Sequence, residues 1–181
     1  MKIISVPNPL LKEVSKPVEK VDKKLISFIQ DLEKTLVHKK NPEGVGLSAI
    51  QVAKPWRVFA TYLDHSDPTS VTTHINPVIV SSSKKMSLGG PENKPFLEGC
   101  LSINNTFGPV WRHQRITLEY QVLDENFELR SERKKYESFP ARVMQHEMDH
   151  LDGILFTERA LEQNLPLYRE EDGELVEIEF N

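Results

Sequence analysis

Two histidines four residues apart are the first feature of this chain that could do chemistry. They enclose a glutamate in the segment His146-Glu147-Met148-Asp149-His150. On an α-helix, residues four apart lie about 40° apart around the axis and about 6 Å along it, so both imidazoles project from one face and could bind one cation. The carboxylate between them is then close enough to take a proton from water that the cation activates. The segment predicts a metal site. The alternative is that the histidines are hydrogen-bonded core residues or surface residues that bind no metal.

A catalytic metal also needs a third protein ligand and an open coordination position. One class of zinc protease would supply a histidine at position 156, where this chain has Phe156. Another would supply a glutamate from a later helix, and the candidates are Glu158, Glu162, Glu170 and Glu171. A thiolate from Cys100, the single cysteine of the chain, would complete a Cys-His-His set. A lone cysteine also occurs as a small buried hydrophobic residue, and it is the histidine pair that favours the ligand interpretation.

A third cluster is rich in glycine and ends in an amide: Gly44-Val45-Gly46-Leu47-Ser48-Ala49-Ile50-Gln51. Taken alone, a turn that leads into a strand explains both glycines. The same residues could form the wall of a tight site, with the Gln51 side-chain NH₂ as a donor to developing negative charge.

Two helices are predicted to position these groups. Between Asp22 and Asn41 the apolar residues recur at helical spacing, with Asp22 as N-cap and Asn41-Pro42 as a stop. The residues of the apolar face are Leu25, Phe28, Ile29, Leu32 and Leu36. A second helix begins at Ser138, with Pro140 in its first turn and Gly153 just after its end, and it carries the histidine pair.

Strands are predicted between and after these helices. β-branched and aromatic residues mark 57–63 and 73–80, alternation marks a hairpin over 116–129 with its turn at 124–126, and a terminal strand is expected at 175–180. The segment 81–95 is rich in Ser, Gly, Pro and Lys, which indicates a mobile surface loop. We therefore expect an α+β fold of a single domain, residues 1–181. In it, antiparallel β-sheets pack around a central C-terminal helix that carries the His-Glu-x-x-His motif, and an N-terminal amphipathic helix accompanies them.

Composition limits the remaining possibilities. The chain has 181 residues, 38% hydrophobic and 28% charged, which is ordinary for one soluble domain. A formal charge of −4 gives no global basic field to bind nucleic acid specifically. The first residues lack the apolar run of a secretory signal, and no run approaches the ~18 apolar residues of a membrane span, so we expect a cytoplasmic protein without membrane attachment. The charged run 130–135 is interpreted as a solvated hairpin edge, with ribosomal RNA contact as the alternative.

The three clusters together resemble the three sequence motifs of the peptide deformylases. Gly44 to Gln51, Glu98 to Ser102 and Gln145 to His150 stand in the order of those motifs and with roughly their separations. The similarity continues through Leu151-Asp152-Gly153, and overall it extends from Asn8 near the start to Phe156 near the end. Three joint motifs of this length are highly specific, whereas the histidine motif alone is not.

The resemblance implies a role for each matching position. It implies metal ligands at Cys100, His146 and His150, with Glu147 as general acid and base. It implies that Gln51 and the backbone N–H of Leu101 polarise the substrate carbonyl, and that Glu98 and Arg112 form an ion pair that braces the cysteine loop. The remaining positions, implied to bind the substrate and its methionine side chain, are Val45, Gly46, Gly99, Phe139 and Val143.

The activity implied by the resemblance is hydrolysis of the N-terminal formyl group from formyl-methionyl nascent peptides, with release of formate. The implied cofactor is one divalent metal ion, with Fe²⁺ favoured and Zn²⁺, Ni²⁺ or Co²⁺ as alternatives, because thiolate and imidazole accept all of them. Formyl-methionyl peptides and transient ribosome contact are the implied partners. Two other functions stay open: a zinc endopeptidase with a late glutamate ligand, and a deformylase-like protein that binds metal without turnover.

Two departures from the family pattern are visible. Ser48 stands where the family usually has alanine, and its hydroxyl needs a hydrogen-bond partner if it is buried. The segment 103–109 lacks the proline and arginine that the family commonly shows there and has Asn104, Thr106 and Phe107 instead. This second departure concerns peptide preference beyond methionine.

Overall fold

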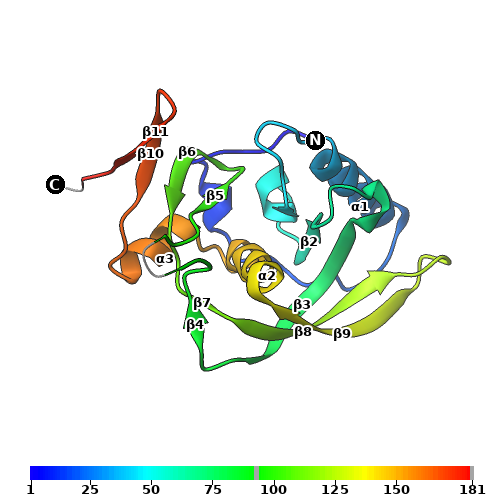
Figure 1. Cartoon of the computed structure of the whole chain (residues 1–181). Coiled ribbons are helices and arrows are strands. Elements are labelled where there is room, and N and C mark those ends of the chain that lie inside the picture. Colours follow the sequence, from blue (N-terminus) through cyan, green and yellow to red (C-terminus); the bar gives the residue numbers. More distant parts are fainter. Residues whose placement is uncertain (92–93, 180–181) are drawn as a thin grey trace.

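Three antiparallel sheets and three α-helices make up the computed structural model, which describes residues 1–91 and 94–179 (Figure 1). The largest sheet has five strands in the spatial order β1 (Gly46–Ser48), β2 (Val58–Thr61), β3 (Thr72–Ser82), β8 (Arg115–Leu123) and β9 (Leu129–Glu137). The second sheet has four, in the order β11 (Glu174–Glu177), β10 (Tyr168–Glu171), β6 (Ile103–Gly108) and β5 (Glu98–Cys100). The third pairs β4 (Met86–Ser87) with β7 (Arg112–His113). This is the small α+β fold with antiparallel sheets that the sequence predicts.

Helix α1 (Lys23–Val37) packs its apolar stripe on the β1–β2 end of the large sheet. The Asp22 carboxylate accepts a hydrogen bond of 2.8 Å from the Leu25 N–H, which satisfies one of the free donors at the helix start. All five apolar residues of the expected stripe are buried, and they share one core cluster with Leu47, Val58 and Ala60. The helix ends four residues earlier than the Asn41-Pro42 signal.

Helix α2 (Ser138–Leu151) lies between the sheets and carries both motif histidines (Figure 1). Its buried apolar residues pack against β2, β8 and β9 in one cluster, while α3 (Phe156–Glu162) and β6 form a second cluster beyond its C-terminal end. The chain turns at Gly153 with φ +72°, and a Cβ there would lie 2.5 Å from the Lys12 carbonyl oxygen. Only glycine fits this turn, which brings the end of α2 against the N-terminal segment.

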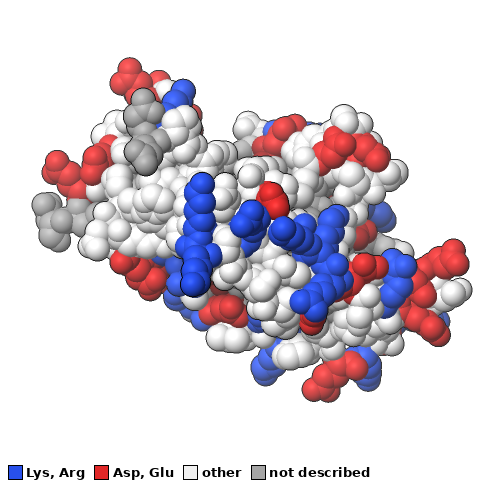
Figure 2. Space-filling view, turned by 60° about the horizontal axis from the view of Figure 1, so that its bottom comes forward, with Lys and Arg blue, Asp and Glu red and all other residues white. Residues whose placement is uncertain are grey.

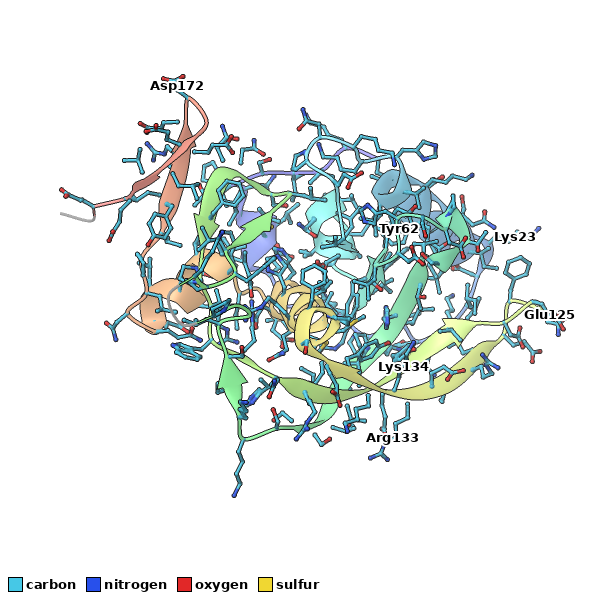
Figure 3. The ribbon with its side chains drawn as sticks, in the orientation of Figure 1. Lys23, Tyr62, Glu125, Arg133, Lys134 and Asp172 are labelled. Atoms are coloured by element: carbon cyan, nitrogen blue, oxygen red, sulfur yellow. The ribbon has the colours of Figure 1, made fainter. Side chains whose placement is uncertain are left out.

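The hairpin of β8 and β9 extends well beyond the apolar residues that predict it. Its register runs from Arg115 opposite Glu137 to Leu123 opposite Leu129, and Asp124 closes the turn by accepting hydrogen bonds from two backbone N–H groups. Figure 3 places Glu125 at the tip of this hairpin. Basic residues of β9 form ion pairs with acidic residues on the same strand and on β8, including an Arg133–Glu119 pair of 3.2 Å. On the face drawn in Figure 2, basic and acidic side chains are interspersed.

The segment expected as a loop, 81–95, contains regular structure and corrects that prediction. Ser81 and Ser82 complete β3, and Met86–Ser87 forms β4 by pairing with β7. A two-residue strand has no periodicity of its own, so its partner strand, far along the chain, determines it. Residues 92–93 of the expected loop lie outside the described residues.

The C-terminal strand is one arm of a hairpin rather than a single strand. β11 runs over Glu174–Glu177, so it begins one residue before the predicted 175–180 and covers 175–177 of it; Phe180 lies outside the described residues. Its partner β10 also pairs with β6, where Tyr168 stands opposite Phe107. Asp172 marks the tip of this hairpin in Figure 3. Across the described part of the chain, no helix is both long enough and apolar enough for a membrane crossing.

A buried histidine lies beneath α2 in the large sheet. His74 is fully buried, with its ring stacked on Phe59 at 4.6 Å and its Nε2 3.2 Å from the Tyr136 hydroxyl. Burial lowers the pKa of His74 from 6.5 to about 3, and the charge of Lys134 acts in the same direction. The imidazole is therefore neutral in the folded protein at neutral pH.

We expect His74 to make the protein acid-sensitive. Because the pKa in the folded state lies below that in the unfolded state, the unfolded state takes up a proton first as the pH falls. The contribution of neutral His74 to the free energy of unfolding is fully present above pH 6.5 and is lost as the pH falls from 6.5 toward 3. Between pH 7 and 4.5 the free energy of unfolding should decrease by about 2–3 kcal/mol from this cause, which urea unfolding can measure. His74→Gln should remove that part of the pH dependence, whereas the exposed His38→Gln should leave it; equal slopes in both variants would contradict the assignment.

Candidate metal centre and active site

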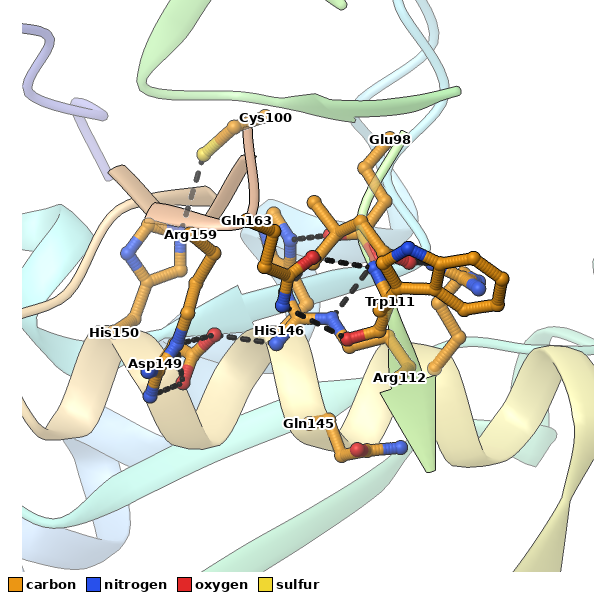
Figure 4. A network of polar contacts seen from close by, with 12 residues as sticks. Glu98, Cys100, Trp111, Arg112, Gln145, His146, Asp149, His150, Arg159 and Gln163 are labelled. Atoms are coloured by element: carbon orange, nitrogen blue, oxygen red, sulfur yellow. Dashed lines mark hydrogen bonds and ion pairs between the residues drawn. The ribbon is translucent and has the colours of Figure 1, made fainter. Parts of the chain in front are cut away.

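The two motif histidines and the cysteine meet at one point. His146 and His150 project from α2 with ring centroids 5.0 Å apart, and Cys100 ends β5 beside them. The Cys100 Sγ lies 3.2 Å from the His150 Nε2. One ligand atom from each of the three residues lies within 4.8 Å of the others, so together they could hold a metal ion. Figure 4 shows Cys100 next to His150, and His146 earlier on the same helix.

The chemistry of this donor set fits a divalent transition metal. Burial opposes ionisation of Cys100, but the neighbouring His150 and His146 outweigh it and lower the thiol's pKa to about 5. A thiolate is the form that binds metals. The His146 Nδ1 lies 3.0 Å from a carboxylate oxygen of Glu98, and the same imidazole also contacts the Cys100 side chain. Metal-bound histidines regularly have such a partner, and sulfur with two imidazoles suits Zn²⁺ and Fe²⁺.

Glu147 lies in a narrow space next to these ligands. Its side chain is 3% exposed, and burial, the largest effect, raises the pKa of its carboxyl group. A Cβ on Gly46 would lie 2.2 Å from the Glu147 Oε1, so β1 can pass this carboxylate only with glycine at position 46. On its other side, the Ser48 hydroxyl donates a hydrogen bond of 2.6 Å to Oε2.

Gln51 reaches the same point from the short 3₁₀ helix Ala49–Val52. Its Oε1 accepts a hydrogen bond of 2.9 Å from the Ser48 N–H. Its Nε2 donates to the Ser102 hydroxyl at 3.1 Å and to the Cys100 sulfur at 3.5 Å. The amide NH₂ is therefore oriented toward the cysteine loop.

A buried ionic network supports the ligands from behind (Figure 4). Glu98 accepts hydrogen bonds from Arg112 at 2.9 and 3.0 Å and from Arg142 at 2.6 Å. Burial opposes its charge, but Arg112 and then His146 outweigh burial and hold the pKa of Glu98 well below its usual range. Arg112 also donates to Asp149, which pairs with Arg159 at 2.8 Å. The Glu98–Arg112 pair was expected from the sequence, whereas Arg142, Asp149 and Arg159 were not.

A signal for part of this network is present in the motif itself. Asp149 stands directly before His150 on a helix that is buried on most sides, and a buried carboxylate requires a cation. Which arginine supplies that cation depends on tertiary packing, because Arg112 comes from β7 and Arg159 from α3.

We expect Glu98→Gln to destabilise the protein by about 3–5 kcal/mol, because it removes the carboxylate that pairs with the buried Arg142 and one of the two carboxylates that pair with the buried Arg112. Urea unfolding at fixed metal concentration measures this loss. Glu132→Gln, which removes an ion pair on the exposed strand β9, is the matched control and should change stability by less than about 1 kcal/mol. Equal losses in the two variants would show that the buried network contributes no more to the free energy of unfolding than an exposed ion pair does.

A cavity of about 480 Å³ opens onto these groups. All the residues expected to bind substrate line this cavity: Val45, Gly46, Gly99, Phe139 and Val143. The other predicted site residues also line it, except His150 and Arg112. Arg112 lies behind Glu98, and His150 contacts the Cys100 sulfur. The sequence did not indicate Phe96, whose ring lies 5.5 Å from that of Phe139 in an edge-to-face contact. Phe107 on β6 lines the same cavity and packs against Gly99.

This fold and this cavity define a class: small α+β proteins in which a Cys-His-His group that could bind metal lies beside a buried glutamate. Comparisons with known proteins identify the family. The sequence model described as polypeptide deformylase matches residues 1–165. Peptide deformylase from Maricaulis maris (strain MCS10) is 37% identical over 155 residues, which cover 85% of this chain and 81% of that protein.

Solved structures agree with the sequence comparisons. Peptide deformylase from Synechococcus elongatus, in complex with actinonin, gives a TM-score of 0.74 at 29% identity and covers 87% of this chain and 79% of that one. The enzyme from Legionella pneumophila gives 0.72 at 31% identity, with 87% and 84% covered. The chain belongs to the peptide deformylase family. It is a hydrolase that removes the formyl group from the N-terminal methionine of nascent peptides.

Proposed function

We propose that Cys100, His146 and His150 hold one divalent metal ion, Fe²⁺, for this reaction. The observation that carries the proposal is the convergence of the three ligand atoms within 4.8 Å of one another, at a cavity that Glu147 also lines. When bound, such an ion lowers the pKa of water and polarises a carbonyl group. The family's dependence on metal supports the ion, and elemental analysis of anaerobically purified protein tests its identity.

Glu147 is the general base and acid in this proposal. As an anion, it removes a proton from the water that attacks the formyl carbon, and it then delivers this proton to the departing amine nitrogen. Its burial and the raised pKa of its carboxyl group support the role, because a base whose pKa lies nearer neutrality also serves as an acid. Formate and a free methionine N-terminus are the products.

Gln51 and the backbone N–H of Leu101 stabilise the oxygen of the formyl group as it becomes negative. The orientation of the Gln51 NH₂ toward the cysteine loop supports this role, and Leu101 lines the same cavity. One such donor typically lowers the activation free energy by about 3 kcal/mol.

The methionine side chain is proposed to occupy the apolar part of the cavity, against Val45, Phe139 and Val143. Gly46 and Gly99 leave room for the peptide backbone to approach the ligands, and Glu98 with Arg112 holds the cysteine loop in place. The Synechococcus elongatus enzyme binds actinonin, which supports the binding of a ligand by this family member as well. We further propose that residues 1–181 act as one catalytic domain in the cytoplasm. Their contact with ribosomes is transient, and they bind neither membranes nor specific nucleic acid.

The test is formate release from formyl-Met-Ala by protein of known metal content. The Fe²⁺ form should release formate stoichiometrically with free methionyl peptide and leave internal peptide bonds intact. A metal-loaded protein that releases no formate would support the binding protein without turnover, and cleavage of internal bonds would support the endopeptidase.

A further inference from the structure

Ser48 is a completely buried residue that the mechanism above does not use. It ends β1 and precedes the 3₁₀ helix that carries Gln51. Its hydroxyl donates the 2.6 Å hydrogen bond to the Glu147 Oε2 and lies 3.3 Å from the Glu147 backbone carbonyl. This is the partner that a buried hydroxyl at position 48 requires, and it is the side chain proposed as general base.

The carboxylate of Glu147 is confined from two directions. Gly46 lies so close to it that a Cβ would come within 2.2 Å of Oε1, while the Ser48 hydroxyl holds Oε2. Gly46 restricts the carboxylate by contact but cannot determine its rotation. A short hydrogen bond to one oxygen determines which oxygen faces the cavity, because hydrogen bonds are directional.

The backbone of Ser48 acts on the second functional side chain. Its N–H donates to the Gln51 Oε1 at 2.9 Å, which leaves the Gln51 NH₂ facing Cys100 and Ser102. One residue thus orients both the proposed base and the proposed amide donor. The N–H persists in any substitution except proline, so the hydroxyl is the part that mutation can test.

We propose that Ser48 is a positioning residue for deformylation, in which its hydroxyl fixes the orientation of the Glu147 carboxylate toward the substrate. The inference rests on the proposed role of Glu147. It makes a specific claim about kinetics: loss of the hydroxyl reduces the fraction of molecules with a productively oriented base and leaves substrate binding intact.

Ser48→Ala tests this claim, with Ser15→Ala as the matched control. Ser15 is also buried, at 4% exposed, and its hydroxyl has no hydrogen-bond partner among the described residues. Ser48→Ala should lower kcat about tenfold while KM and the bound metal per chain stay within about twofold of the parent, since a misplaced catalytic group costs turnover rather than binding. Ser15→Ala should leave kcat unchanged. An unchanged kcat in Ser48→Ala, or a loss explained by lost metal, would overturn the proposal.

Two further measurements separate positioning from a general structural effect. In a Glu147→Gln background, Ser48→Ala should cause no additional loss of kcat, because the two side chains act through one contact. Ser48→Thr keeps the hydroxyl and should recover most of the lost turnover. Full additivity of the two substitutions would overturn the proposal.

A structural measurement keeps the inference separate from the proposed function. In a crystal structure of Ser48→Ala the Glu147 carboxylate should rotate or occupy more than one position, whereas the parent shows one. This outcome stands even if the parent protein releases no formate, which would refute the function and not the contact. A single unchanged carboxylate position in Ser48→Ala would overturn the positioning role.

Discussion

Glu147→Gln will lower deformylation at least about 10²-fold while metal content stays at the parent level. A glutamine of the same shape fills the space between Gly46 and Ser48 but cannot accept a proton from water or return it to the leaving amine. General acid–base catalysis by one positioned side chain contributes about 10²–10⁴ to a rate. Steady-state kinetics with formyl-Met-Ala, alongside elemental analysis of the same samples, measures both quantities.

The matched control for this change is Glu162→Gln on α3. Glu162 has an exposed side chain whose nearest cation is Arg159 at 3.6 Å, and it does not line the cavity. Its kcat should equal that of the parent. If Glu147→Gln retains near-normal turnover, proton transfer is carried by another group, and the assignment of the general base is wrong.

The sequence predicts those parts of the molecule whose causes are local. The apolar stripe of α1 and its Asp22 cap are contained in one short segment, so periodicity and capping chemistry predict the helix directly. The pairing of His146 with His150 on one helix face has the same local origin. The β8–β9 hairpin is also local, because its turn at Asp124 joins two adjacent strands.

Features that depend on distant partners could not be predicted in this way. The two residues of β4 form a strand because β7 pairs with them, and β10 joins the second sheet through β6, more than 60 positions earlier in the chain. Nothing in the composition of 81–95 distinguishes such a strand from a loop. Short edge strands of this kind depend on the assembled sheets.

The active site shows the same division between local and tertiary causes. Spacing alone brings the histidines together on α2, whereas Cys100 comes from β5. No spacing predicts that the sulfur lies beside the histidines; the histidine pair favoured it as the third ligand, and the family resemblance implied the same position. Of the arginines that neutralise Glu98 and Asp149, the sequence indicated Arg112 but neither Arg142 nor Arg159, because each pair joins separate elements. The Ser48 hydroxyl was noticed as a departure from the family, and the fold gives it Glu147 as its partner.

Cys100→Ala should abolish stoichiometric metal binding and, with it, deformylation. Without the sulfur, only His146 and His150 remain of the group that could hold the ion, and two imidazoles rarely retain a catalytic metal. Titration with Zn²⁺ alone, followed by calorimetry and by elemental analysis after dialysis, should show about one ion per chain for the parent protein and almost none for the variant. The variant should still fold, because the substitution removes one sulfur and leaves the Glu98 network intact.

Glu170→Gln is the discriminating control for that experiment. Glu170 belongs to β10 and lines the same cavity, so it is the late glutamate best placed to act as third ligand in an endopeptidase. Of the others, Glu158 is bound to Lys12 at 2.5 Å, and Glu162 and Glu171 lie within 3.8 Å of arginines. Glu170→Gln should keep both the metal and formate release. Metal lost from Glu170→Gln and retained by Cys100→Ala would show that the third ligand is the Glu170 carboxylate rather than the Cys100 sulfur. That result would favour peptide-bond cleavage over deformylation.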